Sequence, residues 1–349
     1  MRNKLLSLAL ALVLCLGLIL PASAASSGYS DIPSGHWSEE SVRRATQLGL
    51  FEGTGDGKFG RGQPITRAAF VTAMVRLFGW EEVTPAKASY TDVTSNRWFY
   101  TAIETARANG AFASTSGAFH PTANITREEM AVMLIRSLDY ASLAGTAGSY
   151  SSPFTDVTTN KGFITLAYDL GIVDGVGNGK FAPDSTATRE QAAAMLVRLY
   201  DRLHARSTKL STAGSYTKIT VETPKASDSD AMPTTPLEPI GELYAQLRSA
   251  KNRGTDLSRA VLCLTEGGVR TITSSSGIAA TDTLSADEVQ DILSRSGVKT
   301  YYSTRYESAY CIYRPNSYQT ATLWYQSDES LAAKLQLARL FGVTKYIFV

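Results

Sequence analysis

One pattern occurs three times in this chain and constrains its fold more than any other feature: a Thr-Arg pair that opens an apolar run of helical period. The copies are 65–70 (ITRAAF), 125–130 (ITREEM) and 187–192 (ATREQA). Thr126 with Glu129, and Thr188 with Gln191, predict capping boxes, in which a Thr hydroxyl and a Glu or Gln side chain satisfy backbone N–H groups at the helix start. The first copy has Ala69 where the box needs the acid or the amide.

The arginines of these copies, Arg67, Arg127 and Arg189, occupy the first position of the predicted helices. A cation there faces the positive end of the helix dipole, which costs some tenths of a kcal/mol. An anion at each helix start would make the position favourable, because free N–H groups and the guanidinium would converge on a carboxylate or phosphate. We therefore predict three anion sites at these helix starts.

The Thr-Arg pairs belong to a longer repeat that extends from about Tyr29 to Leu203. Each copy begins with an extended lead, continues with a first helix that ends in glycine, and reaches the second helix through a loop ending in Phe. The recurring positions are the lead aspartates (Asp31, Asp92, Asp156), the glycine stops (Gly49, Gly110, Gly171) and the loop glycines (Gly57, Gly117, Gly179). These units predict a mainly α half, in which three helix–loop–helix units supply one another's core, as a closed pseudo-threefold bundle or an open stack.

The first residues predict export. Arg2 and Lys4 precede an apolar run, 5–20, and an Ala-Ser-Ala site follows before Ala25, which is typical of a secretory signal. The alternative is an uncleaved anchor helix, although the run is short for a membrane span. The predicted mature chain has no membrane segment. It carries Cys263 and Cys311, either as a disulfide or as buried thiols.

Composition and spacing argue against several other classes of function. The net charge of +2 gives no sign of a nucleic-acid partner. No metal-ligand spacing occurs, no cofactor motif was found, and the two late cysteines have no histidine after His204 to pair with. We expect these parts: signal 1–24, repeats 25–85, 86–149 and 150–204, linker 205–239, and a small α+β domain 240–349.

The repeats resemble the S-layer homology (SLH) module of bacterial cell-surface proteins, in its usual tandem of three. The likeness rests on the Asp lead, His36-Trp37, the loop GDGKF at 55–59 and the Thr-Arg helix starts. It implies a trefoil-like prism whose central helices come one from each unit. It also implies binding, in the grooves between units, of a secondary cell-wall polysaccharide that often bears pyruvate ketals, which are carboxylates.

The candidate ligand-binding residues follow from this likeness and from the anion argument. They are Arg67, Arg127, Arg189, Trp37, Trp98, Asp31, Asp92, Asp156, Gly57, Gly117 and Gly179. The two tryptophans either stack on sugar faces or pack half-buried; the aspartates are turn or cap residues that can also lie at a groove edge. The third unit has Gly162 at the Trp position, so we expect the third groove to be the weakest.

The C-terminal region predicts alternating helices and strands. Helices are expected over 240–250, from the Ser285 cap to Gly297, and over 328–340; strands are expected over 260–264, 268–273, 300–302, 309–313, 320–325 and 344–349. A brief strand is also expected within the linker, over 216–221.

The closing stretch from Leu323 to Leu331, with Lys334, Gly342 and a terminal strand, resembles the end of family-18 glycoside hydrolases. That likeness makes 261–264 the seventh barrel strand and 268–319 an inserted subdomain. The family's Asp-x-x-Asp-x-Asp-x-Glu string is absent, Gln326 replaces an Asp, and a barrel needs about 200 residues or more. We therefore interpret 240–349 as a partial barrel remnant, a truncated product or a small α+β domain of convergent pattern. We expect no enzyme, but a secreted protein attached to the bacterial cell wall. The alternatives are an envelope glycosidase and a structural S-layer subunit.

Overall fold

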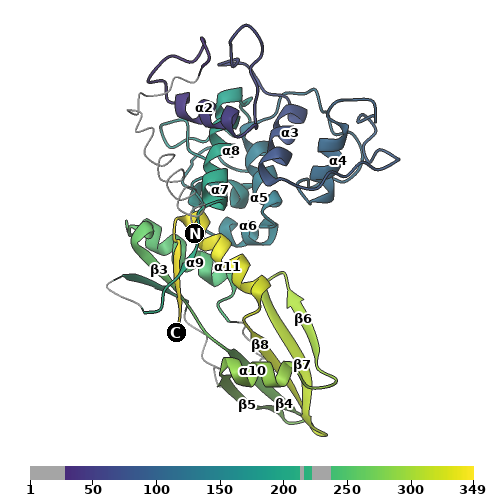
Figure 1. Cartoon of the computed structure of the whole chain (residues 1–349), viewed down its shortest axis with the longest axis vertical. Coiled ribbons are helices and arrows are strands. Elements are labelled where there is room, and N and C mark those ends of the chain that lie inside the picture. Colours follow the sequence, from purple (N-terminus) through teal and green to yellow (C-terminus); the bar gives the residue numbers. More distant parts are fainter. Residues whose placement is uncertain (1–27, 213–215, 222–236) are drawn as a thin grey trace, which may run out of the picture.

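The computed structural model describes residues 28–212, 216–221 and 237–349; the predicted signal segment lies outside them. Figure 1 shows the helices of the first 200 residues gathered at one end of the molecule and a β-sheet at the other, with α9, α11 and β3 between them. The chain is thus a mixed protein, with a mainly helical half followed by a part built from helices and two sheets.

Each repeat contributes two helices. The pairs are α2 (Glu39–Gln47) with α3 (Arg67–Phe78), α4 (Tyr100–Ala108) with α5 (Arg127–Ser137), and α7 (Lys161–Asp169) with α8 (Arg189–Leu203). The predicted capping boxes at Thr126 and Thr188 are confirmed, and Thr66 caps α3 through its hydroxyl alone. The glycines after the first helices have φ of 68°, 73° and 69°, the left-handed conformation expected at a helix stop.

The first helix of each unit packs on the second helix of a neighbouring unit. Helix α4 of the second unit packs on α3 of the first, α7 of the third packs on α5 of the second, and α2 of the first packs on α8 of the third. Backbone hydrogen bonds follow a matching order: Ile125 N–H donates to Ile65, Ala187 to Ile125 and Ile65 to Ala187, at 2.9–3.1 Å. No unit can form these contacts alone.

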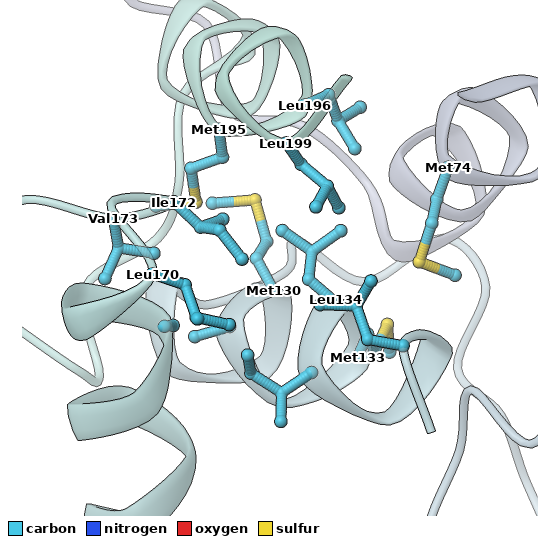
Figure 2. Close-up of a cluster of buried hydrophobic side chains, with 14 of the residues drawn as sticks. Met74, Met130, Met133, Leu134, Leu170, Ile172, Val173, Met195, Leu196 and Leu199 are labelled. Carbon is cyan, nitrogen blue, oxygen red and sulfur yellow. The ribbon is translucent and has the colours of Figure 1, made fainter. Parts of the chain in front are cut away.

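The second helices α3, α5 and α8 supply the centre of the core. Figure 2 shows Met74 from α3, Met130 and Leu134 from α5, and Leu196 and Leu199 from α8 directed toward a common cluster. All of these side chains are buried. Apolar burial contributes about 25 cal/mol per Å², so this shared cluster is what makes the units depend on one another.

An additional helix, α6 (Ala141–Gly148), precedes the third unit and packs across α7. The two backbones approach most closely at Gly162, where an added Cβ would lie 1.9 Å from the carbonyl oxygen of Ala144. Helices α2, α4 and α7 begin at residues 39, 100 and 161. The structure therefore places Thr159, and not the predicted Gly162, at the position of Trp37 and Trp98, two residues before the helix.

The segment expected to be a linker takes part in a parallel sheet. The predicted strand over 216–221 is confirmed as β2 (Thr217–Thr220), and β1 (Thr208–Lys209) was not predicted. The strand order is β1-β9-β3-β2, with β3 (Ala260–Leu264) and β9 (Lys345–Phe348) at the centre. The flanking helices are α9 (Ile240–Asn252) and α11 (Asp328–Phe341). An extended, solvated linker is therefore wrong for the strands within 208–220.

A second, antiparallel sheet is inserted between β3 and α11, in the order β5-β4-β8-β7-β6. Its elements are β4 (Gly268–Ser274), β5 (Gly277–Leu284), α10 (Ala286–Leu293), β6 (Lys299–Ser303), β7 (Ser308–Asn316) and β8 (Gln319–Tyr325). Helix α10 covers one face through Val289 and Ile292, and the predicted Ser285 cap is confirmed. Cys263 and Cys311 are both buried and free, so the disulfide alternative is wrong.

The C-terminal part joins the repeats through buried polar contacts. The Asp169 carboxylate accepts the Tyr244 hydroxyl at 2.6 Å and Arg248 Nε at 2.8 Å. Lys251 Nζ donates to the carbonyls of Tyr168 and Asp169 at the end of α7, where a cation also suits the helix dipole. Apolar residues of α9 and α11 belong to the same core as the repeats.

Candidate functional site: the arginine grooves between the repeats

Each Thr-Arg arginine crosses to the loop of the next unit. Arg67 Nε donates to the Phe119 carbonyl at 2.9 Å, Arg127 Nε to Phe181 at 2.8 Å, and Arg189 Nε to Phe59 at 2.9 Å. Each guanidinium also lies over the ring of the same phenylalanine, with Cζ 4.6–5.0 Å from the centroid. The third arginine returns to the first loop, which closes the set.

These contacts correct the electrostatic argument for an anion at the helix start. The first two N–H groups of α3 donate to the carbonyls of Ala123 and Pro121, and those of α5 to Ser185 and Pro183. They are not free to share a ligand with the guanidinium. The carbonyl oxygens of the neighbouring loop already compensate the arginine, so its presence at the helix start does not by itself require an anion.

The predicted aspartates hold the same loops in place. Asp31 accepts N–H groups from Phe59, Gly60 and Arg61, all at 2.8 Å. Asp92 and Asp156 accept two each, from Phe119 and His120 and from Phe181 and Ala182. The Phe181 N–H contributes most to lowering the pKa of Asp156. At Asp31 and Asp92, burial raises the pKa but the backbone N–H groups outweigh it.

The predicted glycines lie where lead and loop meet. The carbonyls of Gly57, Gly117 and Gly179 accept the N–H groups of Ser30, Thr91 and Thr155 at 2.8–2.9 Å. All three have positive φ, between 65° and 89°, a conformation that glycine adopts without steric cost. The aspartates and glycines together fix the position of the loop phenylalanine, and hence of the arginine that it holds.

The Arg127 groove contains the richest combination of side chains. Its cavity, about 410 Å³, is lined by residues from all three units: Trp37, Arg127, Asp174, Gly175, Val176, Gln191, Ala194, Met195 and Arg198. Trp37 is 58% exposed, which contradicts half-buried packing. Arg127 is buried, and its Nε and Nη2 donate hydrogen bonds to the carbonyls of Phe181 and Asp174. Burial lowers the pKa of Arg127.

The Arg67 groove has the opposite electrostatic character. Its cavity, about 200 Å³, is lined by Arg67 together with Glu128, Glu129 and Asn160. Arg67 Nη1 forms an ion pair with Glu129, while Glu128 accepts hydrogen bonds from Thr159 and Asn160. Thr159 stands at the tryptophan position of the third unit, two residues before α7, and the lining of this groove contains no tryptophan.

Arg189 repeats the arrangement of Arg127, with Nε on Phe59 and Nη2 on the Glu52 carbonyl at 2.8 Å. Burial lowers the pKa of Arg189 as well. Trp98 is 66% exposed and stands just before α4, which packs on α3. The structure therefore brings each arginine to a junction between units but does not make the three junctions alike.

Sequence reasoning missed part of the Arg127 groove, notably Arg198 and Asp174, which form an ion pair at 2.7 Å. A signal was present for Arg198. An arginine recurs nine positions after each Thr-Arg arginine, at Arg76, Arg136 and Arg198. Asp174 gave no such signal, because the equivalent loop position in the second unit is Ala113.

The part of the chain that the structure describes contains no group of three or more His, Cys, Asp and Glu side chains placed to hold a metal. Among helices located between residues 28 and 349, gaps excepted, none combines the length and hydropathy that a membrane span requires.

Known proteins with similar sequences include S-layer proteins, in agreement with the resemblance of the repeats to the S-layer homology module. The S-layer protein sap of Bacillus anthracis is 26% identical over 209 residues, 59% of this chain and 25% of that protein. An endoglucanase of Bacillus sp. (strain KSM-635) is 28% identical over 207 residues, 56% of this chain and 22% of that one. The chain thus spans about a quarter of the length of such relatives.

Solved structures give only partial superpositions. The spore cortex-lytic enzyme SleL of Bacillus megaterium QM B1551 has a TM-score of 0.31 at 14% identity, covering 38% of this chain and 36% of that one. The chitinase of Chromobacterium violaceum ATCC 12472 has a TM-score of 0.31 at 17% identity, covering 39% and 40%. Such scores carry no argument about function.

The sequence model of the S-layer homology family matches residues 28–71, 89–131 and 153–193, so this chain carries three S-layer homology domains.

Proposed function

We propose that this protein attaches non-covalently to the bacterial cell wall by binding an acidic secondary wall polysaccharide in grooves between its repeats. S-layer homology domains bind cell-wall polymers in general, which supports the coarse assignment and a location at the cell surface. We also propose that the three units form a closed pseudo-threefold bundle, supported by the cyclic order of their arginine and backbone contacts.

The Arg127 groove carries the proposal. The hydrogen bonds of the described residues use Nε and Nη2 of Arg127, and Nη1 is left to meet a ligand oxygen. Arg198 is paired with Asp174 at 2.7 Å, whereas Arg127 has no carboxylate partner among the described residues, and Trp37 offers an exposed ring. A sugar that bears a carboxylate, such as a pyruvate ketal, matches this combination, because an Arg–carboxylate contact is charge-assisted and an aromatic ring provides flat apolar area.

The same reasoning makes the Arg67 groove a poor anion site. Its single guanidinium is neutralised by Glu129, and Glu128 adds a further negative charge to the lining. A second carboxylate brought by a ligand would meet like charges, which is unfavourable. We propose that the Arg127 groove, and by its equivalent contacts the Arg189 groove, bind the acidic sugar while the Arg67 groove does not.

A pelleting assay with purified wall sacculi tests this assignment. Trp37→Ala and Arg127→Lys should lower the bound fraction, whereas Arg67→Lys, a matched change in the Glu129-paired groove, should leave it near wild type. Stripping the secondary polymer from the sacculi should abolish pelleting of all variants. Far-UV circular dichroism checks that each variant is folded. Unchanged pelleting of a Trp37→Ala/Arg127→Lys/Arg189→Lys variant, or pelleting that survives stripping, would overturn the proposal.

Attachment without catalysis is our proposal for the C-terminal part as well. The strongest candidate for a catalytic site in this part is the cluster of Glu238, Gln326 and Lys334. Lys334 Nζ donates hydrogen bonds to the Leu237 carbonyl at 2.9 Å and to the Gln326 side-chain oxygen at 2.8 Å. Burial lowers the pKa of Lys334 to about 8. Release of reducing sugars from sacculi would favour the glycosidase alternative instead, and assembly into lattices the S-layer alternative.

A further inference from the structure

The inserted sheet carries a cavity of about 540 Å³ at the ends of β6 and β7. Its lining includes the three cations Arg295, Lys299 and Arg314, and no Asp or Glu. Arg295 is paired with Asp291, but in the described part of the chain Lys299 and Arg314 have no ion-pair partner. Two exposed and unpaired cations beside one cavity give it a local positive potential that the overall charge of the chain does not reveal.

The strand register places these cations on the same face as aromatic side chains. Lys299 pairs with Ile312, and Tyr301 pairs with Tyr310 in the neighbouring strand. The Tyr301 ring stacks on Tyr310 at 5.2 Å with planes 22° apart, and Tyr310 lies 4.6 Å from the Trp324 ring. The inner rings thereby hold Tyr301, which is 42% exposed, in one orientation.

This face of the sheet is free of α10, which packs on the opposite face through Val289 and Ile292 against Cys311 and Leu323. Ile312 is 38% exposed beside Tyr301. A large aromatic ring and an aliphatic side chain kept in water next to cations are features of a binding surface rather than of a core.

We propose that this surface, made of Lys299, Tyr301, Ile312 and Arg314, is a second binding site for a carboxylated glycan. A sugar ring would lie on Tyr301, and its carboxylate would meet Lys299 and Arg314. The sheet stands at the end of the molecule opposite the repeats (Figure 1). A wall polymer that occupied this surface and a groove at the same time would be attached at two points. Two linked sites give a higher overall affinity than either site alone, without additional contacts at either site.

Calorimetric titration with oligogalacturonide, a defined carboxylated glycan, tests the site. The parent protein is residues 28–349 with Trp37→Ala/Arg127→Lys/Arg189→Lys, so that the proposed groove sites do not contribute. Lys299→Ala/Arg314→Ala should weaken binding at least about tenfold, because two charge-assisted contacts are lost. The matched double variant Lys218→Ala/Arg259→Ala removes two exposed cations near the other sheet and should stay within about twofold of the parent protein, since screened charges at a distance contribute little. Maltodextrin, a neutral glycan, should not bind detectably at this site.

Tyr301→Ala separates a sugar site from a simple patch of charge. It should weaken oligogalacturonide binding about fivefold or more and leave binding of inorganic polyphosphate unchanged. Equal effects of the two double variants, no binding by the parent protein, or no effect of Tyr301→Ala on oligogalacturonide would each overturn the proposal. The proposed groove sites are removed from the parent protein, so failure here is independent of the sacculus assay.

Discussion

The close contact between α6 and α7 determines whether Gly162→Ala raises or lowers the free energy of unfolding. Gly→Ala normally stabilises a protein by about 0.4–1 kcal/mol, because alanine reduces the freedom of the unfolded chain and favours helix. At Gly162 the added methyl group would lie 1.9 Å from the Ala144 oxygen, 2.9 Å from the Ala144 carbonyl carbon and 3.0 Å from the Gly148 nitrogen. All three atoms belong to backbone, which cannot rotate away.

Relief of this overlap requires α6 to withdraw by roughly 1 Å, which costs about 1–3 kcal/mol by analogy with overpacked cores. After the propensity gain is subtracted, we expect Gly162→Ala to lower the free energy of unfolding by about 1–2 kcal/mol. The melting temperature would then fall by about 1.5–3 °C, because the entropy of unfolding of a chain of this length is about 0.7 kcal/mol/K. Urea denaturation and calorimetry of residues 28–349 would measure both quantities.

Gly145 provides the matched control. It lies in α6 itself, at negative φ, with nothing within 4 Å of an added Cβ. Gly145→Ala should therefore raise the free energy of unfolding by about 0.5–1 kcal/mol. If Gly162→Ala is as stable as wild type or more so, the close approach of α6 and α7 is wrong.

Backbone N–H groups lower the pKa of Asp31 below its ordinary 3.8. The Asp31 carboxylate therefore contributes fully to stability above that value, and its contribution is lost as pH falls through the folded-state pKa. Asp31→Asn should lower stability at pH 7 and flatten the acid limb of a stability–pH curve, and an unchanged limb would refute this. Asp169→Asn leaves Arg248 facing a neutral amide in a largely buried site and should cost about 2–4 kcal/mol, with the repeats and the C-terminal part still unfolding in one calorimetric transition. Cys263 and Cys311 should react with an aromatic disulfide reagent only after denaturation, since both are buried and burial raises the pKa of Cys311 to about 11; rapid reaction of the native protein would contradict this.

Features of the fold that depend on neighbours in sequence could be predicted. The caps at Thr126 and Thr188 and the glycine stops need only residues within one helical turn. The partners of the arginines could not be predicted, because Arg67 and Phe119 lie 52 residues apart and Arg189 and Phe59 lie 130 apart. Without those partners, compensation by an anion was the simplest account of a cation at a helix start.

Elements that expose most of their residues also escaped prediction. Strand β5 is exposed along nearly all its length, so it shows no alternation of apolar and polar side chains. The two residues of β1 are too few to give a pattern. Helix α6 consists of small residues, in the sequence ASLAGTAG, whose weak helical signal becomes meaningful only when α7 is seen to pack against it at Gly162.

The contacts that join Arg127 to the third unit support the ligand-binding role that we propose for this residue. The carbonyls of Phe181 and Asp174 fix the guanidinium before any ligand arrives, so binding need not order that side chain again. Any ligand that binds only the folded form adds RT ln(1 + [L]/Kd) to stability, about 2.7 kcal/mol at a hundredfold excess over Kd. The C-terminal part shares the core of the repeats and the buried Asp169 contacts. An acidic sugar in the Arg127 groove should therefore stabilise the whole chain, including the sheet that carries Tyr301, rather than the repeats alone.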